Sequence, residues 1–265
     1  MARELVILKL GGSVITDKSK PFTASVETID RISEEIAHAN FKPMAIVHGG
    51  GSFGHSVAAE HRISRGYEGS SQLMGFAKTR QAMMQLNKLV TDSLISHGIA
   101  AVSLQPSAFI ITANGRIVDL NTNIIEKLLG KDLVPVLYGD AVMDEKMGFT
   151  ILSGDQIAAR LAIALNASRI VLAVDVDGVY TADPKLDSSA KLIGEMRLRE
   201  LRELVKELGE NRKVADVTGQ MLGKMEETIS ALENVVSIAV VNGLKPGRLL
   251  QALKNRRFIG TIIRP

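Results

Sequence analysis

Short runs of β-branched and aliphatic residues alternate along this chain with longer segments of helical periodicity, and no other feature limits its fold as strongly. Such alternation is typical of parallel strands joined by crossover helices. The sequence therefore predicts an α/β fold with an open, mainly parallel central sheet. Strands are expected at residues 4–10, 42–47, 99–104, 133–138, 169–174, 235–241 and 260–264, and helices at 26–39, 75–97, 122–130, 156–166, 197–208 and 219–232 and after Pro246.

One segment departs from this alternation. Residues 139–155 hold two short apolar arms around the sequence DEKMG, which predicts a hairpin and the one antiparallel interruption of the sheet. No linker of low complexity and no internal repeat divides the chain. A division into two lobes that share one continuous sheet is therefore expected near the end of this hairpin, with residues 1–153 on one side and 154–265 on the other.

Composition narrows the class of ligand. A formal charge of +3, aromatic residues at 4% and no basic run longer than Arg256 and Arg257 argue against a nucleic-acid surface. The chain has no cysteine, which excludes disulfides and thiolate metal sites, and no run approaches 18 apolar residues. We expect a cytoplasmic protein that acts on a small anionic ligand and has no membrane or nucleic-acid partner.

The first strand leads into the sequence LKLGGSVITDK, which carries two glycines between two lysines. Ligands of an open parallel sheet bind beyond the carboxyl ends of its strands. A phosphate cradle would use the N–H groups of Gly11, Gly12 and Ser13 with the charges of Lys9 and Lys18. The alternative is a tight turn with two solvated lysines. Because Lys9 lies within an apolar strand, where an unpaired charge is costly, the cradle is favoured.

The second strand leads into HGGGSFGH, residues 48–55. Its glycines match the dinucleotide pattern G-x-G-x-x-G, but the acidic residue expected at a strand end about 20 positions later is missing. We therefore interpret the segment as a loop for an anion smaller than a dinucleotide. His55, which follows the glycines, is expected to contact the ligand. His48 either contacts it as well or completes the strand.

Three later segments have two interpretations each. Asp155 in LSGDQ either caps a helix or orients a lysine in an anion site. The aspartate-rich AVDVDGVYTADPK, with Asp175 and Asp183, is either a turn-rich loop or a loop around a ribose and base. TGQMLGKM is one residue too short for a P-loop and lacks a hydroxyl after Lys224. A helix that opens at Gly219 and carries Lys224 would nevertheless suit the phosphate tail of ATP.

The motifs as a set predict a type of chemistry. The sequence has several anion-binding strand ends and lysines from distant segments, with no sign of an activated serine or cysteine nucleophile, a Cys/His metal cluster or a paired acid and base. That inventory is typical of phosphoryl transfer, in which the protein positions the reactants and neutralises charge.

The order of these motifs resembles that of the amino acid kinase superfamily across essentially the whole chain, and GGSVITDK and GGGSFGH are most similar to the forms in isopentenyl phosphate kinases. The resemblance implies a three-layer αβα sandwich, an N-terminal lobe for the phosphate acceptor, a C-terminal lobe for ATP with Mg²⁺, and commonly a homodimer. It implies direct transfer from ATP to isopentenyl phosphate, in the alternative mevalonate pathway. Gln220 departs from the glycine usual in the family's DVTGGM motif.

The resemblance also assigns roles to individual residues, with no metal ligand among them. Lys9 and Lys18 would neutralise the transferring group, and Asp155 would hold the lysines in place. The acceptor phosphate would bind to Gly49, Gly50, His55 and Gly154. The nucleotide would bind to Lys9, Gly11, Gly12, Ser13, Asp175, Tyr180, Asp183, Lys185, Gly219 and Lys224. For an apolar tail of the acceptor, Phe76 and Met83 or Met84 are candidates, although a core helix needs such residues too.

Other acceptors and another class of protein stay open. A related kinase could act on a carboxylate, as glutamate 5-kinase and acetylglutamate kinase do, or on a nucleotide, as uridylate kinase does. A nucleotide-binding protein of the same fold could lack turnover. His55 separates these cases, since a cationic donor placed for a compact phosphate is expected only in an isopentenyl phosphate kinase.

Overall fold

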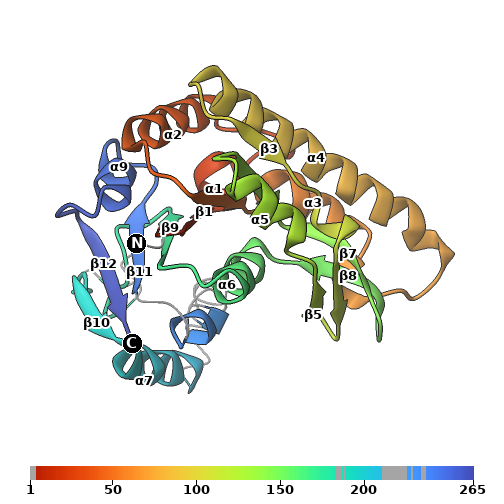
Figure 1. Cartoon of the computed structure of the whole chain (residues 1–265). Helices are drawn as coiled ribbons and strands as arrows, with labels where there is room; N and C mark the ends of the chain where they lie inside the picture. The colour runs from red at the N-terminus through yellow and green to blue at the C-terminus, as the bar shows by residue number, and fades with distance from the viewer. Residues whose placement is uncertain (1–3, 183–186, 188, 211–225, 228, 234–236) are drawn as a thin grey trace.

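A central sheet with helices on both faces organises the chain (Figure 1). The computed structural model describes residues 4–182, 187, 189–210, 226–227, 229–233 and 237–265. Within them, an 8-stranded sheet has the order β10-β12-β11-β9-β1-β2-β6-β3. Its strands are β1 (Val6–Leu10), β2 (Met44–His48), β3 (Ala101–Ser103), β6 (Val134–Tyr138), β9 (Arg169–Val174), β10 (Glu195–Arg197), β11 (Ser237–Asn242) and β12 (Gly260–Arg264). The predicted α/β sandwich with a mainly parallel sheet is confirmed.

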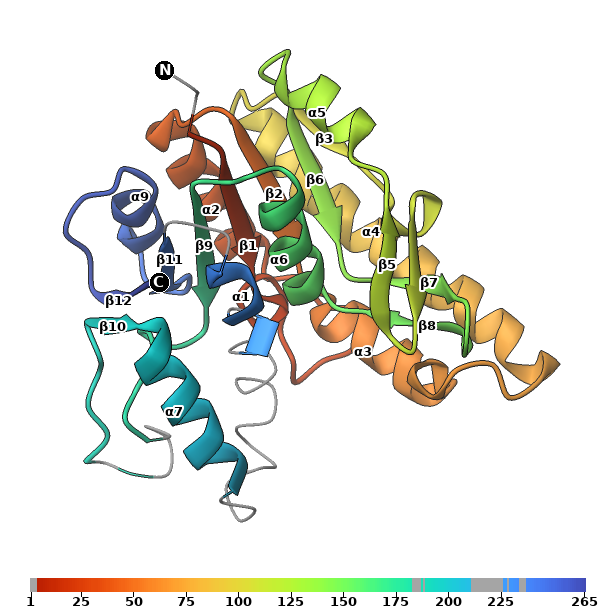
Figure 2. The ribbon, with the colours of Figure 1, turned by 60° about the horizontal axis from the view of Figure 1, so that its bottom comes forward.

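Helices cover the two faces of this sheet. The α-helices with described bounds are α1 (Gly12–Ile15), α2 (Val26–Ala39), α3 (Gly51–Glu60), α4 (Leu73–Ser96), α5 (Asn123–Leu129), α6 (Gly154–Ala164), α7 (Leu198–Glu210) and α9 (Arg248–Leu253). Short 3₁₀ helices lie at Ile63–Arg65, Ser70–Gln72 and Pro106–Ala108. In Figure 2, α6 lies in front of β1 and β2, while α2 and α4 lie behind the sheet. Among the described residues, no helix has both the length and the apolar character needed to span a membrane.

Alternation along β1 divides its side chains between two cores. Val6, Leu8 and Leu10 belong to the cluster shared with α2 and α4, whereas Ile7 belongs to the cluster shared with α6. Successive side chains of a strand point to opposite faces, so Lys9 lies on the same side as Ile7. That position directs its ammonium group toward the beginning of α6.

A second sheet lies beside the first and has the order β5-β4-β7-β8. It is formed by β4 (Ile110–Ala113), β5 (Arg116–Leu120), β7 (Asp140–Asp144) and β8 (Gly148–Leu152). The β7–β8 pair confirms the hairpin predicted within residues 139–155. The expectation of a single antiparallel interruption was wrong, because β4 pairs with β5, and β11 with β12, in antiparallel fashion. Both pairs are short, and β4 and β5 carry no strong alternation.

The sequence HGGGSFGH is a helix start rather than a loop. After β2, only Gly49 and Gly50 connect the strand to α3, which begins at Gly51. Gly51 has a φ of +49°, and a Cβ there would lie 2.0 Å from the Thr16 hydroxyl. Only glycine permits both this conformation and this approach. His55 consequently lies in the second turn of a helix, so the prediction of a loop up to His55 was wrong.

Asp144 joins the two tight turns of the second sheet. Its carboxylate accepts hydrogen bonds, at 2.8 to 3.1 Å, from the Thr112 hydroxyl and the N–H groups of Asn114, Gly115, Lys146 and Met147. Burial alone would raise the pKa of this carboxyl, but the hydrogen bonds outweigh burial and hold the pKa well below its ordinary value. The charged form of Asp144 therefore stabilises the folded state.

We expect Asp144→Asn to lower the free energy of unfolding by about 1–3 kcal/mol at pH 7, because the amide accepts fewer of these bonds and carries no charge. The folded-state pKa is depressed, so the contribution is complete above the unfolded pKa of about 3.9 and is lost as pH falls below it. Urea unfolding of both proteins should show a difference that shrinks toward acid pH. The exposed Asp119→Asn, on β5, is the matched control; a pH-independent difference for Asp144 would contradict the argument.

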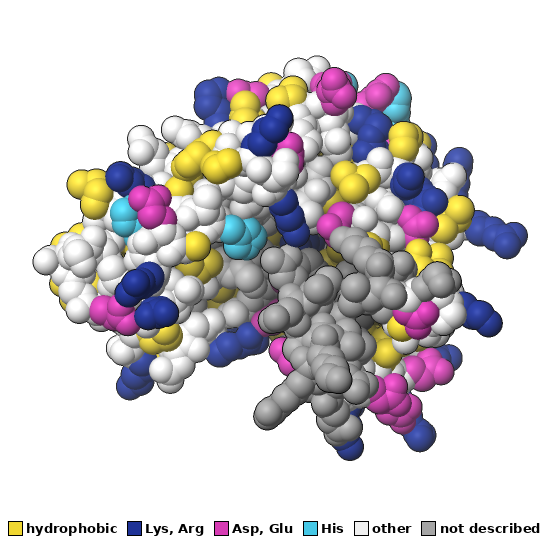
Figure 3. Space-filling view, turned by 180° about the vertical axis from the view of Figure 1, so that it is seen from behind, with side chains coloured by type: hydrophobic (Ala, Val, Ile, Leu, Met, Phe, Trp, Pro, Cys, Tyr) yellow, Lys and Arg dark blue, Asp and Glu magenta, His cyan; other side chains and the backbone are white. Residues whose placement is uncertain are grey.

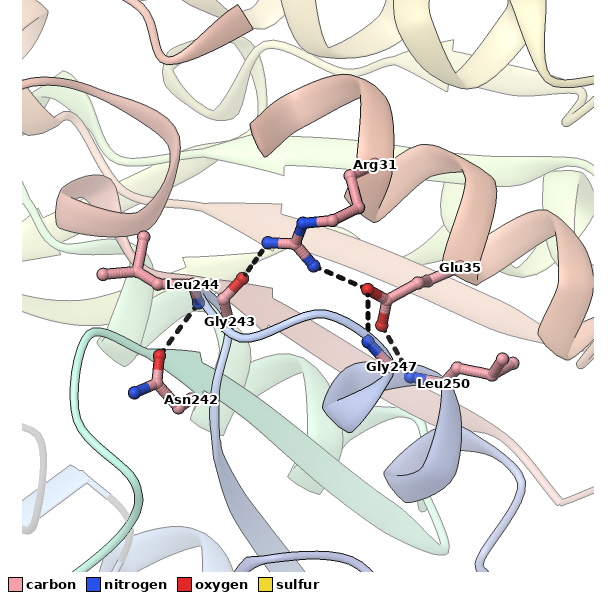
Figure 4. A network of polar contacts seen from close by, with 7 residues as sticks. All are labelled: Arg31, Glu35, Asn242, Gly243, Leu244, Gly247 and Leu250. Carbon is pink, nitrogen blue, oxygen red and sulfur yellow. Dashed lines mark hydrogen bonds and ion pairs between the residues drawn. The ribbon is translucent and has the colours of Figure 1, made fainter. Parts of the chain in front are cut away.

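A polar network anchors the segment that follows β11 to α2 (Figure 4). Arg31 donates to the Gly243 carbonyl at 2.6 Å and pairs with Glu35 at 2.5 Å. Glu35 in turn accepts from the Gly247 and Leu250 N–H groups at 2.9 and 3.0 Å. A buried carboxylate is stable here because it is paired and caps the first turn of α9. The network fixes the edge of the sheet at which β9 and β11 end.

Candidate active site

A cleft of about 320 Å³ lies at the carboxyl ends of β1, β2 and β6. Figure 3 shows a face of the molecule on which a histidine, a basic side chain and hydrophobic side chains gather near the middle. The lining residues are Lys9, Gly12, Ser13, Lys18, Gly49, Gly50, Gly54, His55, Ala58, Thr79, Met83, Gly139, Asp140, Ile151, Leu152, Ser153, Gly154, Asp155, Glu226 and Glu227. Ten of the predicted site residues are therefore brought together, namely Lys9, Gly12, Ser13, Lys18, Gly49, Gly50, His55, Met83, Gly154 and Asp155.

Lys9 and Asp155 form a buried ion pair at the floor of the cleft. Their Nζ and Oδ1 atoms are 2.6 Å apart, and the lysine side chain is 2% exposed. The cap of α6 is Ser153, whose hydroxyl accepts from the Gln156 N–H at 3.1 Å, so Asp155 is not the capping residue. Of the two interpretations of Asp155, the geometry supports the one in which it orients a lysine. The pair keeps a cation in a place where a lone charge would be costly.

Within the described residues, three helices begin at this cleft and bring backbone donors to it. Gly12 and Ser13 start α1, Gly50 caps α3, and Gly154 starts α6. The first N–H groups of a helix have no intrahelical acceptor, and the helix dipole makes that end positive. A Cβ on Gly12 would lie 2.4 Å from the nitrogen of Gly51, so glycine is required where α1 meets α3.

Two of the predicted backbone donors are already used within the sheet. The N–H of Gly11 donates to the Ala173 carbonyl at 2.8 Å, and that of Gly49 donates to the Leu10 carbonyl at 2.9 Å. The expectation that Gly11 and Gly49 offer N–H groups to a ligand was therefore wrong. Both residues extend strand ladders by one position, which sequence patterns do not distinguish from the loop that follows.

The loop that carries Lys18 is fastened to α3. The Ser52 N–H donates to the Thr16 hydroxyl at 3.0 Å, and the Ser52 hydroxyl donates to the Thr23 carbonyl at 3.2 Å. Thr16 and Ala24 also form an antiparallel bridge at the base of the loop. The hydroxyl in GGGSFGH thus fixes the segment that brings Lys18 to the same cleft as Lys9.

His55 lines the cleft from the second turn of α3. Its Nδ1 atom lies 2.8 Å from the Gly51 carbonyl oxygen. A carbonyl only accepts, so Nδ1 carries a proton, and Nε2 carries one only when the ring is the imidazolium cation. In that charged form His55 can donate to an anion in the cleft. His48, by contrast, is fully buried and does not line the cleft.

Apolar side chains also line the cleft. Ala58, Met83, Ile151 and Leu152 line it, and Ala58 and Ile151 belong to a small core cluster of α3 and β8. Phe76 does not line the cleft; its ring packs on Phe149 with centroids 5.1 Å apart, within the same cluster. The cleft is therefore lined by Lys9, Lys18 and helix N-termini, by carboxylates and by apolar side chains.

Of the residues expected at the nucleotide, Lys9, Gly12 and Ser13 line the cleft, whereas those from later segments lie elsewhere or outside the described part of the chain. Asp175 follows β9, and Tyr180 bridges to Leu192; neither lines the cleft. Asp183, Lys185, Gly219 and Lys224, and with them Gln220, lie outside the described residues. The loop after β9 is held by Asp177, which pairs with Arg248 at 2.7 Å.

Sequence reasoning missed several residues of the cleft. Asp140, which follows β6, is buried, and burial raises the pKa of its carboxyl even though Ser107 and Ala141 donate to it. The rule that ligands bind beyond strand ends would have found it, since β6 ends two residues earlier. Thr79 and Glu227 carry no comparable signal, because tertiary packing alone brings them to the cleft.

An open α/β sheet whose strand ends gather lysines and helix N-termini defines a protein that binds phosphate groups and is suited to their transfer. The model of the amino acid kinase family matches residues 4–242. The chain belongs to this family and is a kinase.

Individual relatives narrow the comparison. The chain is 40% identical to an isopentenyl phosphate kinase of Methanothermobacter thermautotrophicus, in an alignment that covers 98% of each protein. It is 36% identical to an isopentenyl phosphate kinase of Methanocaldococcus jannaschii, over 94% of this chain and 95% of that protein. An isopentenyl phosphate kinase solved by X-ray diffraction superposes with a TM-score of 0.85 at 37% identity, covering 98% of this chain and 99% of its own. A Thermoplasma acidophilum isopentenyl phosphate kinase in a product complex superposes with a TM-score of 0.80 at 30% identity. The superposition covers 98% of this chain and 100% of that chain.

Proposed function

We propose that this chain transfers the γ-phosphoryl group of ATP to the phosphate of isopentenyl phosphate, forming isopentenyl diphosphate. The observation that carries the proposal is that one cleft combines Lys9, Lys18 and helix N-termini with the apolar side chains of Ala58, Met83 and Ile151. A phosphate with a short hydrocarbon tail matches both the cationic and the apolar lining residues. The relatives that cover nearly the whole chain are isopentenyl phosphate kinases, which supports the same acceptor.

Transfer would proceed by positioning and charge neutralisation. An oxygen of the acceptor phosphate forms a bond to the γ-phosphorus, and the bond from that phosphorus to the bridging oxygen of ADP breaks. Negative charge spreads over the transferring group, where Lys9 and Lys18 stabilise it. His55 in its cationic form holds the acceptor phosphate, and Asp155 keeps Lys9 in place by its 2.6 Å ion pair.

ATP would enter with Mg²⁺, which supplies charge neutralisation between the phosphates. Within the described residues, no group of three or more histidine or acidic side chains forms a metal cage. That arrangement is compatible with Mg²⁺, which commonly binds to substrate phosphates and only one or two carboxylates. The N–H groups of Gly12 and Ser13 would bind the nucleotide phosphates, and that of Gly154 would bind the acceptor phosphate.

We further propose a division of labour and an assembly that the resemblance implies. Residues 1–153 would bind the acceptor and residues 154–265 the nucleotide, and two copies would form a homodimer in the cytoplasm. Acceptor-side residues such as His55 and Met83 precede the boundary, which supports the division. Sedimentation of the purified protein would test the dimer.

An ADP-release screen is expected to single out the acceptor. Turnover with isopentenyl phosphate should exceed that with glutamate, acetylglutamate and UMP by at least about 100-fold, because these acceptors place polar groups against the apolar side chains of the cleft. Dimethylallyl phosphate, which shares the charge and tail size, serves as the matched comparison. ATP binding without release of ADP for any acceptor would favour a nucleotide-binding protein without turnover, and preferential use of UMP or an amino acid would favour a different acceptor class.

A further inference from the structure

A buried histidine that the proposed reaction does not use lies directly behind the cleft. His48 ends β2 and is 0% exposed, and its ring stacks on Tyr138 with centroids 5.6 Å apart. Burial lowers the pKa of His48 to about 4, so its imidazole is neutral near pH 7. A neutral ring buried with two polar atoms needs two hydrogen-bond partners, and both are present.

The partners of His48 form a chain in which each donor is fixed. Nδ1 lies 3.0 Å from the Gly49 carbonyl oxygen, which only accepts, so Nδ1 carries the proton. Nε2 of the neutral ring is then an acceptor, and it receives a hydrogen bond from Nδ2 of Asn87 at 3.1 Å. The Oδ1 atom of Asn87 accepts from the Ser103 hydroxyl. The hydrogen bonds therefore all donate in one direction, from Ser103 through Asn87 and His48 to the Gly49 carbonyl.

Holding that carbonyl also sets the direction of the next N–H group. The C=O of Gly49 and the N–H of Gly50 belong to one planar trans peptide, in which they point in opposite directions. Among the described residues, the Gly50 N–H donates no hydrogen bond, and Gly50 lines the cleft. A peptide between two glycines rotates easily, so its orientation needs an external constraint.

We infer that His48 is a positioning residue, which holds the Gly49–Gly50 peptide so that the Gly50 N–H faces the acceptor phosphate. The identity of that phosphate rests on the proposed function. Asn87 and Ser103 act through His48: they fix the tautomer that donates to Gly49. The ligand therefore meets an N–H group whose direction is set before binding, which is how preorganisation strengthens binding.

The test compares two variants of the full-length protein in steady-state kinetics. His48→Phe keeps the ring and its stacking on Tyr138 but removes both hydrogen bonds. It is expected to raise the KM for isopentenyl phosphate about tenfold, with the KM for ATP and kcat changed less than about twofold. In His48→Asn, the amide nitrogen takes the place of Nδ1 and should restore most of the acceptor KM. Equal KM values in wild type and His48→Phe, or a parallel rise of both KM values, overturn the inference, since a merely structural role affects both substrates alike.

A binding measurement separates this inference from the proposed function. In ¹H–¹⁵N spectra, the Gly50 amide of the wild type should shift on addition of inorganic phosphate, and the shift should saturate at a concentration about tenfold higher in His48→Phe. If the wild-type protein does not turn over isopentenyl phosphate, the proposed function is wrong. The inference about His48 is still tested in that case, because the phosphate titration does not depend on turnover. If His48→Phe does not fold, Asn87→Leu takes its place. This variant is expected to raise the KM for isopentenyl phosphate by a smaller factor. If the Gly50 amide then saturates at the same phosphate concentration as in the wild type, the inference is overturned.

Discussion

Lys9→Met is expected to lower kcat by about 10²- to 10³-fold while changing the KM for ATP much less. The reason is the position of the ammonium group, which is buried at the floor of the cleft and held 2.6 Å from Asp155. A charge so desolvated and fixed stabilises negative charge that develops in the transition state more than it stabilises the bound ground state. Steady-state kinetics of ADP release with isopentenyl phosphate would measure both constants.

Loss of stability must be separated from loss of catalysis in this variant. Lys9→Met removes the buried ion pair with Asp155, which lowers stability. The double variant Lys9→Met, Asp155→Asn removes the charge of Asp155 as well, so it should recover thermal stability but not kcat. Lys88→Met, which removes an exposed cation paired with Asp92, is the control and should leave kcat unchanged. Lys18→Met should act in the same direction as Lys9→Met, and unchanged turnover in both would refute the mechanism.

His55→Ala should raise the KM for isopentenyl phosphate by about 10- to 100-fold, because a hydrogen bond between charged partners is among the stronger ones. The bond from Nδ1 to the Gly51 carbonyl fixes the ring, so that Nε2 is the atom that serves the acceptor. The KM for ATP should stay close to the wild-type value. Initial rates at varied concentrations of each substrate would separate the two constants.

A second histidine variant controls for general effects of losing an imidazole. His97 follows α4 and pairs with Asp30 at 2.8 Å, and it does not line the cleft. His97→Ala should therefore leave both KM values unchanged. A normal acceptor KM in His55→Ala would remove the role assigned to this residue, and with it the main sequence argument for a phosphate acceptor.

Much of the fold could be predicted because its signals are local. Each expected strand of the central sheet is present, since apolar runs such as residues 4–10 and 169–174 are read directly from the sequence. The weakly alternating β4 and β5 were missed for the opposite reason. The helix at Gly51 was mistaken for a loop because glycine is an unfavourable helix former, and here close backbone contact with α1 outweighs that preference.

The candidate site was predictable where one strand end determines it. Lys9 and Gly12 follow from β1, and Gly50 and His55 from β2, because parallel strands end at the same edge of the sheet. Strand ends do not predict which backbone N–H groups are free to bind a ligand. Gly49 and Gly50 are both glycines at the end of β2, yet only Gly49 donates its N–H to a neighbouring strand. Only hydrogen-bond partners from distant segments distinguish them.

The sequence by itself determined the alternation of strands and helices, the glycines that allow close backbone contacts, and the lysines that mark an anion site. These features depend on periodicity and on the conformational preferences of single residues. Tertiary structure alone decided which groups face one another: Asp155 at Lys9, Ser52 at the loop of Lys18, and Asn87 at His48. The physical reason is that such contacts depend on how elements far apart in the chain pack together, which no local pattern records.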